Sequence, residues 1–193
     1  MKAKTLLGVL MLLFVCNVSQ AQNYNYRTEA VKDIASENIL SVGCKVENLT
    51  IKDLNGNPAV LPYWGQKNIL IFYADPDAYL NGHKTADFAA EIEENKRAAG
   101  PAIEGFGIMN YADSVWPGDM LRKICRKRTE KNGATIINDD QHIFKNTWNL
   151  GDCNGKFLLI LVDKKGVVRY IRREPMDEAG KAEFYEMIKN YTH

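Results

Sequence analysis

Two uninterrupted apolar runs constrain the fold of this chain more than any other feature. One is NILIFYA at residues 68–74, and the other is FLLILVD at residues 157–163. Each run has the length of a strand and is bounded by polar residues, which is typical of a central strand covered on both faces. We therefore expect an α/β protein with a buried central sheet.

Turn signals predict two antiparallel hairpins. Residues 46–54 (VENLTIKDL) alternate imperfectly between apolar and polar side chains, and Asn55 and Gly56 then return the chain into residues 59–64 (AVLPYW). Near the other end of the chain, the run FLLILVD meets a DKKG turn, after which VVRYI returns antiparallel.

Helical spacing predicts helices between and after the strands. We expect a short helix over residues 29–40, a helix over 83–99, a helix opened by Pro117, a short helix over 141–148 and a closing helix capped by Asp177. The apolar faces are expected to consist of Phe88, Ala89 and Ile92, then Met120, Leu121, Ile124 and Cys125, and finally Phe184, Met187, Ile188 and Tyr191.

The order of these elements predicts their arrangement. Further strands are expected at residues 105–111 and 134–137, so strands and helices alternate through the middle of the chain. Parallel strands need crossover connections, and those crossovers cover the faces of the sheet. The sequence therefore predicts a mixed central sheet with helices on both faces.

The first 21 residues have the three parts of a secretory signal peptide. Lys2 and Lys4 precede an apolar run over residues 6–15, and Ser19 and Ala21 occupy the small-residue positions of a cleavage site. The run is too short to cross a hydrocarbon core about 30 Å thick, so a membrane anchor is the weaker interpretation. We expect residues 1–21 to be removed, followed by an N-terminal segment over 22–43 and one domain over 44–193. The product is expected in the periplasm, with secretion as the alternative.

The charge of the exported chain favours neither nucleic acid nor a bilayer as partner. Cleavage leaves 172 of 193 residues, and the loss of two lysines changes the formal net charge from +1 to −1. A cluster of basic residues is the exception, and we interpret it as a solvated face, with an anion or nucleic-acid site as the alternative. It consists of Arg122, Lys123, Arg126, Lys127, Arg128 and Lys131 on one expected helix, with Arg169, Arg172 and Arg173 on the last hairpin.

Three short segments occur in this order along the chain: the DLNG turn at residues 53–56, the strand end IFYA at 71–74 and LVDKKGVVRY at 161–170. Together with the order of elements, they resemble the thioredoxin-like superfamily. The resemblance implies a three-layer sandwich around a mixed central sheet. Within the superfamily, IMNYADSVWPGDM at 108–120 and NDDQHIFKNTWNL at 138–150 resemble the exported YtfJ-like family.

The resemblance implies a catalytic dithiol that this chain lacks. In redox-active thioredoxin-like proteins the first cysteine of CxxC follows the strand after two residues, so the pair would fall at Asp77 and Leu80. A peroxiredoxin-like frame places the nucleophile near Asn81, and the proline expected before the penultimate strand aligns near Phe157. A thiolate at a helix N-terminus is made reactive by backbone donors and the helix dipole, whereas the carboxylate of Asp77 cannot exchange disulfides.

The loop DPDAYLNGH at residues 75–83 is the main candidate for a binding site. It follows a strand at the end of the sheet where α/β folds place function. The loop lacks the glycine and terminal glutamate of a calcium loop, and one histidine is not a transition-metal set, so we expect neither a metal nor a cofactor. A helix-capping turn is the simpler interpretation. The candidate binding residues are Asp75, Asp77, Tyr79, Asn81 and His83.

Three cysteines remain after cleavage, namely Cys44, Cys125 and Cys153. Their odd number and irregular spacing imply neither a disulfide scaffold nor a zinc site. Cys153 is expected to approach the 75–83 loop, which makes it the best candidate for a reactive thiol, with Cys125 or Cys44 as the resolving partner. Packing is the stronger interpretation for Cys125. A bridge between two of the three stays open, because geometry and not spacing decides it.

Two functional hypotheses follow from different classes of protein. A retained fold without its dithiol favours an exported, non-catalytic binding module for a protein or peptide partner, although fold alone does not assign function. The alternative is an atypical thiol-disulfide oxidoreductase or peroxidase that uses Cys153, which predicts a thiol of lowered pKa and reversible oxidation.

Overall fold

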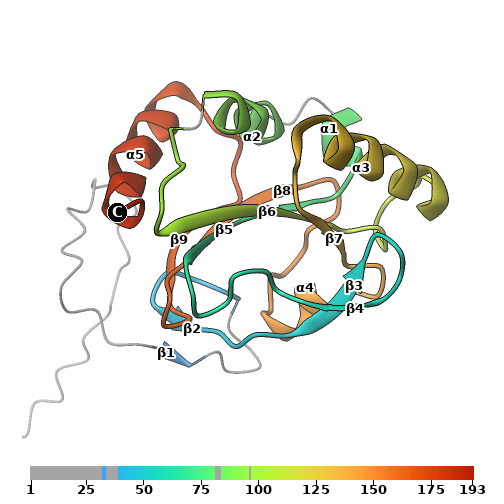
Figure 1. The fold of residues 1–193 in the computed structure, drawn as a ribbon, viewed down its shortest axis with the longest axis horizontal. Coiled ribbons are helices and arrows are strands. Elements are labelled where there is room, and N and C mark those ends of the chain that lie inside the picture. Colours follow the sequence, from blue (N-terminus) through green and yellow to red (C-terminus); the bar gives the residue numbers. More distant parts are fainter. Residues whose placement is uncertain (1–31, 34–38, 81–83, 96) are drawn as a thin grey trace, which may run out of the picture.

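A seven-stranded mixed sheet forms the middle layer of the protein. The computed structural model describes residues 32–33, 39–80, 84–95 and 97–193. The strand order is β4-β3-β7-β6-β5-β8-β9, and helices cover both faces of the sheet, with α2, α3 and α5 on one and α4 on the other (Figure 1). This confirms the expected α/β sandwich.

The central strands β5 and β8 are the most thoroughly buried, whereas their neighbour β6 is partly open. Strand β5 (Asn68–Ala74) pairs in parallel with β6 (Ile103–Met109) and antiparallel with β8 (Phe157–Val162). All six residues of β8 are buried. Its uninterrupted apolar sequence is therefore explained by side chains that pack alternately on the two faces.

Two separate cores lie on the two faces of the sheet. Ile71 of β5 and Ile160 of β8 point toward one core, which also contains Phe144 and Trp148 beside α4 (Ile143–Thr147). Their neighbour Leu70 points to the opposite core. There it meets Phe88 of α2 (Lys84–Asn95) and Phe184 of α5 (Glu178–Ile188). Because successive side chains of a strand alternate between faces, one apolar run supplies both cores.

The two expected hairpins are present. Strand β3 (Thr50–Asp53) pairs antiparallel with β4 (Pro58–Val60), and the Asp53 carboxylate accepts hydrogen bonds from the backbone N–H groups of Asn55 and Asn57. At the other edge of the sheet, β8 pairs antiparallel with β9 (Val168–Arg172). The turn chemistry read from the sequence therefore fixes both edges.

The remaining elements include β7 of the main sheet, two strands that form a separate two-stranded sheet, β1 and β2, and further helical segments. They are β1 (Lys32–Asp33), β2 (Cys44–Lys45), α1 (Asp77–Leu80), α3 (Gly118–Asn132), β7 (Ile136–Asn138) and the 3₁₀ turn η1 (Lys189–Tyr191). As expected, α5 begins after Asp177, whose carboxylate accepts a hydrogen bond from the Gly180 N–H.

Two expectations about helices are wrong. Lys32–Asp33 lie in the expected 29–40 helix but form a short parallel bridge with Cys44–Lys45, and residues 29–31 and 34–38 lie outside the described residues. In α3, Leu121 and Cys125 are buried as expected, whereas Met120 and Ile124 are exposed. The helix contacts the sheet along a stripe too narrow to include all four side chains.

Candidate functional site

The loop after β5 is joined to the loop before β8 by a buried carboxylate. Asp75 is fully buried, and its Oδ2 accepts a 2.7 Å hydrogen bond from the Gly155 N–H while its Oδ1 accepts one of 2.9 Å from the Asp77 N–H. Burial raises the pKa of the Asp75 carboxyl, although the two backbone donors oppose that shift. Asp75 therefore joins two loops inside the protein instead of facing a partner.

Asp77 stands at the first position of α1, directly after the loop that follows β5. Its Oδ1 accepts a 2.9 Å hydrogen bond from the Ser114 hydroxyl, and its Oδ2 accepts one of 3.0 Å from the Val115 N–H. Ser114 and Val115 belong to the loop between β6 and α3. A carboxylate thus occupies the helix-start position at which the superfamily resemblance placed the first cysteine, and it connects two loops at the carboxyl ends of neighbouring parallel strands.

The other residues predicted for this loop are described only in part. Tyr79 lies in α1, whereas Asn81 and His83 lie outside the described residues. Their proposed binding roles remain predictions.

A second polar cluster surrounds Asp113, which is largely buried. The Asp113 carboxylate accepts hydrogen bonds from Asn110 Nδ2 at 2.6 Å, His142 Nε2 at 2.8 Å and Lys145 Nζ at 3.0 Å. Desolvation by burial raises the pKa of Asp113, but these three donors outweigh it and the pKa is lowered overall. The Oδ1 atom of Asn110 is buried without a hydrogen-bond partner in the described part of the chain.

The start of α4 is held beneath this cluster by Asp139. Its carboxylate accepts hydrogen bonds from the Phe144 N–H at 3.1 Å, the Lys145 N–H at 3.0 Å and the Tyr73 hydroxyl at 3.0 Å. Burial raises the pKa of Tyr73, so its hydroxyl stays protonated and donates. Asp139 thereby fixes Lys145 where its ammonium reaches Asp113.

The sequence did not single out the Asp113 cluster as a site. Asn110 and Asp113 follow β6, whereas His142 and Lys145 follow β7. Predicting the cluster therefore requires knowing that these two short polar segments meet in the folded protein. The sequence offered one signal, which is that both segments directly follow predicted strands. The carboxyl ends of neighbouring parallel strands lie at the same edge of the sheet.

The three cysteines of the domain are buried and free. Burial raises the pKa of Cys153 to about 11, although the nearby charges of Lys145 and Arg173 act in the opposite direction. Burial also raises the pKa of Cys125, whose Sγ lies 3.2 Å from the Tyr111 hydroxyl. Cys125 packs with Leu121 in a small cluster, whereas Cys44 and Cys153 belong to the core beside α4.

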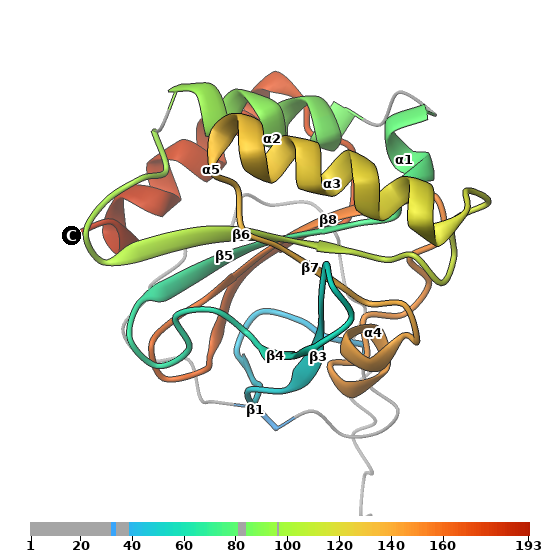
Figure 2. The same cartoon turned by 45° about the vertical axis from the view of Figure 1, so that its right-hand side comes forward.

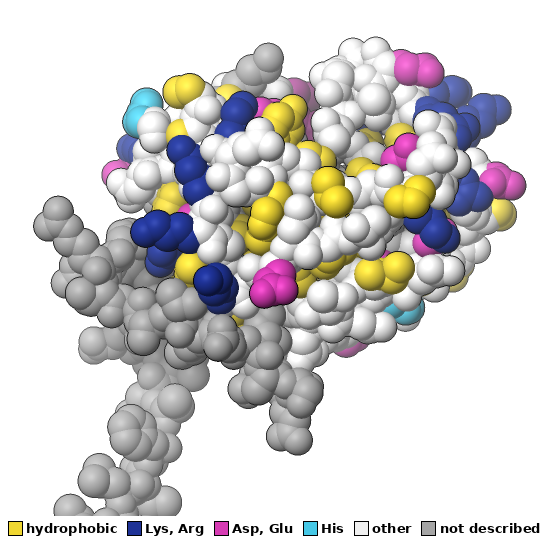
Figure 3. Space-filling model, turned by 60° about the horizontal axis from the view of Figure 1, so that its bottom comes forward, with side chains coloured by type: hydrophobic (Ala, Val, Ile, Leu, Met, Phe, Trp, Pro, Cys, Tyr) yellow, Lys and Arg dark blue, Asp and Glu magenta, His cyan; other side chains and the backbone are white. Residues whose placement is uncertain are grey.

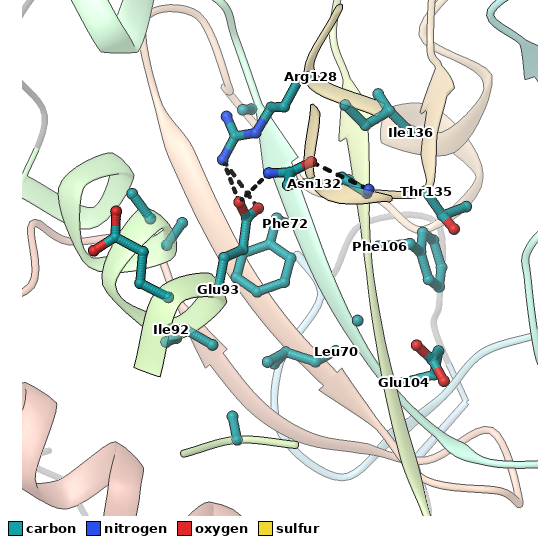
Figure 4. A pocket seen from close by; sticks show the side chains of 18 of the residues that line it. Leu70, Phe72, Ile92, Glu93, Glu104, Phe106, Arg128, Asn132, Thr135 and Ile136 are labelled. Atoms are coloured by element: carbon teal, nitrogen blue, oxygen red, sulfur yellow. Dashed lines mark hydrogen bonds and ion pairs between the residues drawn. The ribbon is translucent and has the colours of Figure 1, made fainter. Parts of the chain in front are cut away.

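An open groove of about 900 Å³ separates α2 from α3. Its floor includes Phe72 of β5 and Gly105 and Gly107 of β6, and the two glycines leave space above a strand in the middle of the sheet. Figure 4 shows that Arg128 of α3 reaches Glu93 of α2 above Phe72, with Nη2 2.9 Å and 2.8 Å from the two carboxylate oxygens. Of the predicted binding residues whose side chains the structure describes, neither Asp75 nor Asp77 lines this groove.

The basic residues of α3 divide into two groups. Arg122 forms an ion pair with Asp119, Arg126 donates a 2.8 Å hydrogen bond to the Leu54 carbonyl, and Arg128 binds Glu93. Lys123, Lys127 and Lys131 are exposed. On the side of the molecule that carries α4, Figure 3 shows Lys and Arg side chains at both margins with acidic side chains among them.

Two further classes of site find no support within the described ranges. No group of three or more His, Cys, Asp or Glu side chains there is arranged to hold a metal ion. No helix in those same ranges is long and apolar enough to cross a membrane.

Comparisons with solved structures identify the fold as thioredoxin-like. A peroxiredoxin-like protein from Aquifex aeolicus superimposes with a TM-score of 0.55 at 14% identity, covering 81% of this chain and 90% of that one. A thiol peroxidase from Chromobacterium violaceum gives 0.53 at 14% identity, with coverages of 83% and 90%. A putative thiol:disulfide interchange protein DsbE from Chlorobium tepidum gives 0.52 at 12% identity, with coverages of 80% and 99%. No protein-family profile and no curated protein matches the chain.

Proposed function

We propose that this thioredoxin-fold chain is a non-catalytic binding module for a protein or peptide partner. The observation that carries the proposal is the Asp77 carboxylate at the start of α1, which is hydrogen-bonded to Ser114 and Val115. A carboxylate there cannot attack a disulfide. The surroundings are nevertheless ordered by hydrogen bonds, which supports a role in recognition.

The states of the described thiols support this choice over thiol chemistry. A catalytic cysteine needs a thiolate near neutral pH, and hence a lowered pKa and solvent access. Cys153 and Cys125 have raised pKa values because they are buried. Cys153 is also enclosed in the core beside α4, where a substrate disulfide has no approach to its Sγ.

The surface beside Asp77 is suited to contact with another chain. Val115 exposes 85% of its surface and Trp116 exposes 36%, directly after Ser114. Exposed apolar residues grouped beside ordered polar atoms are typical of interaction sites. The proposed binding surface therefore consists of residues 114–116 beside Asp77, and the inward-facing Asp75 is not part of it.

We further propose that the protein is exported and acts in the periplasm. Support comes from the charged, apolar and small-residue parts of residues 1–21. Fractionation of the producing cells with N-terminal sequencing tests this. A mature chain beginning at Gln22 in the periplasmic fraction is expected, whereas an intact N-terminus in the cytoplasm would refute export.

Membership of the YtfJ-like family is also a proposal. It is supported by segments 108–120 and 138–150, which contribute Asn110, Asp113, His142 and Lys145 to one cluster. A solved structure of a YtfJ-like protein tests it. The corresponding residues should surround one carboxylate there, and a different arrangement would argue against membership.

Two measurements test the binding function itself. The mature chain should show no turnover in a disulfide-reduction assay with insulin, and turnover that is lost in Cys153→Ser would favour the oxidoreductase alternative. A photo-cross-linking residue is then placed at Val115 and, as a control, at Lys164 in the exposed turn between β8 and β9. Partner adducts are expected from position 115 and not from 164. Equal adducts from both positions would mean that this surface is not selective.

A further inference from the structure

An exposed apolar row runs along α3 from the proposed binding surface. Trp116, Met120 and Ile124 expose 36%, 43% and 52% of their surfaces. Resting on the proposed function, we propose that this row and the lysines beside it dock an acidic amphipathic segment of the partner protein. The row is defined as Trp116, Met120 and Ile124.

Helical spacing places Met120 and Ile124 on the flank of α3 that faces α2, and Trp116 precedes the helix at its N-terminal end. Met120, Ile124 and Arg128 are separated by four residues each, so they lie one above the other. Arg128 binds Glu93 of α2, which shows that this flank of α3 lies next to α2. Leu121 and Cys125 are buried, which keeps the row out of the core. Figure 2 shows α3 and α2 side by side above the sheet.

The row leads into the groove between the two helices. Residues of the C-terminal half of α3, including Lys127, Arg128 and Lys131, line one wall of the groove, and Phe72 and Gly105 lie on its floor. An extended surface therefore begins beside Asp77 and ends in a hollow of about 900 Å³. A helix or extended segment with apolar residues along one side has the shape to follow it.

The exposed lysines beside the row indicate that the partner segment is acidic. Lys123, Lys127 and Lys131 are exposed, and none of them has an ion-pair partner among the residues that the structure describes. They recur every four residues, as the members of the row do, so positive charge borders apolar surface along the helix. Carboxylates on the side of a partner segment that faces α3 would complement this pattern, whereas the opposite wall of the groove carries Glu93 and Glu94 of α2.

A protein segment fits this surface better than a bilayer does. An amphipathic surface that binds lipid enters a flat interface with its whole apolar face. Here part of the apolar surface lies at the bottom of a groove between two helices, where Phe72 lies below the Arg128–Glu93 ion pair (Figure 4). A membrane would therefore leave the concave part of this surface uncovered, whereas a peptide would fill it.

The test is a selection followed by titration. A displayed library of random 20-residue peptides is panned against the mature chain, and the most enriched peptide is synthesised and titrated at two salt concentrations. Met120→Gln with Ile124→Gln removes the apolar side chains of the row that lie on α3. Lys123→Glu with Lys127→Glu reverses the charge of two of the lysines beside the row. The matched controls are Val60→Thr on β4, which also removes an exposed apolar group, and Lys164→Glu with Lys165→Glu in the exposed β8–β9 turn.

The proposal expects peptides that combine acidic and apolar residues. Each α3 double variant should raise the Kd of the selected peptide about tenfold or more. The controls should stay within about twofold, and affinity should fall as salt rises.

Selected peptides that bind all variants equally would overturn this inference and leave the binding function standing. No selected peptide at all would overturn both. Binding of phosphatidylglycerol vesicles in place of peptides, lost in the lysine variant, would show a lipid-binding surface and overturn the inference.

Discussion

The hydroxyl of Ser114 donates a 2.9 Å hydrogen bond to Oδ1 of Asp77, and this contact joins the start of α1 to the loop between β6 and α3. The two residues are 37 positions apart in the sequence. Their contact lies at the position where the resemblance in the sequence predicted the first cysteine of a dithiol. The same position therefore holds a structural carboxylate that orders the surface around it.

The first prediction concerns this contact. Ser114→Ala removes the donor to Asp77 Oδ1 and should lower the free energy of unfolding by about 1 kcal/mol, the usual net value of one hydrogen bond. Urea unfolding followed by circular dichroism measures it. Lys164→Ala, in an exposed turn, is the control and should leave stability unchanged. A Ser114 variant as stable as the parent would show that the contact contributes nothing to folding.

The second prediction concerns Asp113. Asp113→Asn should lower the free energy of unfolding at pH 7 by about 2 kcal/mol, because Asn110, His142 and Lys145 lose an ionised acceptor. Urea unfolding of parent and variant in parallel measures the difference.

The pH dependence of that difference provides its check. The pKa of Asp113 is lowered in the folded protein from an ordinary value of 3.8. Ionised Asp113 therefore stabilises the fold fully above that ordinary value, and the contribution is lost as pH falls through the lowered pKa. Parent and variant should converge in acid. A difference that stays constant from pH 7 to pH 3 would contradict an electrostatic origin.

The third prediction concerns the reactivity of Cys153. Its pKa of about 11, against an ordinary value of 9.0, predicts about a hundredfold less thiolate at neutral pH than in an unfolded chain. Alkylation by iodoacetamide, followed by peptide mass spectrometry, should therefore be slow in the folded protein and fast in urea. Rapid modification of folded Cys153 at pH 7 would revive the oxidoreductase alternative.

The fourth prediction concerns the core that supports the Asp113 cluster. Phe144 is fully buried, stacks on Tyr73 with ring centroids 5.4 Å apart, and packs against the tilted ring of Trp148 at 4.5 Å. Phe144→Ala should lower the free energy of unfolding by about 3–5 kcal/mol. The adjacent Ile143→Ala is the control and should cost far less, because Ile143 is exposed. Similar losses in both variants would mean that α4 does not pack as described.

Most of the framework was readable from the sequence because it depends on local pattern. The apolar runs at 68–74 and 157–163 became the adjacent central strands β5 and β8, and the Asn55-Gly56 turn closed the β3–β4 hairpin. Asp177 capped α5 as its position predicted. These features need only periodicity, turn chemistry and capping.

The functional surface was less readable because it depends on which segments meet. The sequence identified Asp75 and Asp77, yet it could not show that Asp75 turns inward to Gly155 while Asp77 binds Ser114. The exposure of Met120 and Ile124 was likewise hidden. Helical periodicity gives an apolar stripe but not how much of it the sheet covers.

The state of Cys44, Cys125 and Cys153 in purified protein that lacks residues 1–21 tests the central claim most directly. The protein is alkylated in denaturant without reductant, and its intact mass is compared with that of a reduced sample. We predict that both samples carry three alkyl groups, on Cys44, Cys125 and Cys153, because all three are free and buried. A sample that gains two further alkyl groups only after reduction would contain a disulfide. A disulfide that includes Cys153 would contradict the account of a thioredoxin fold without thiol chemistry.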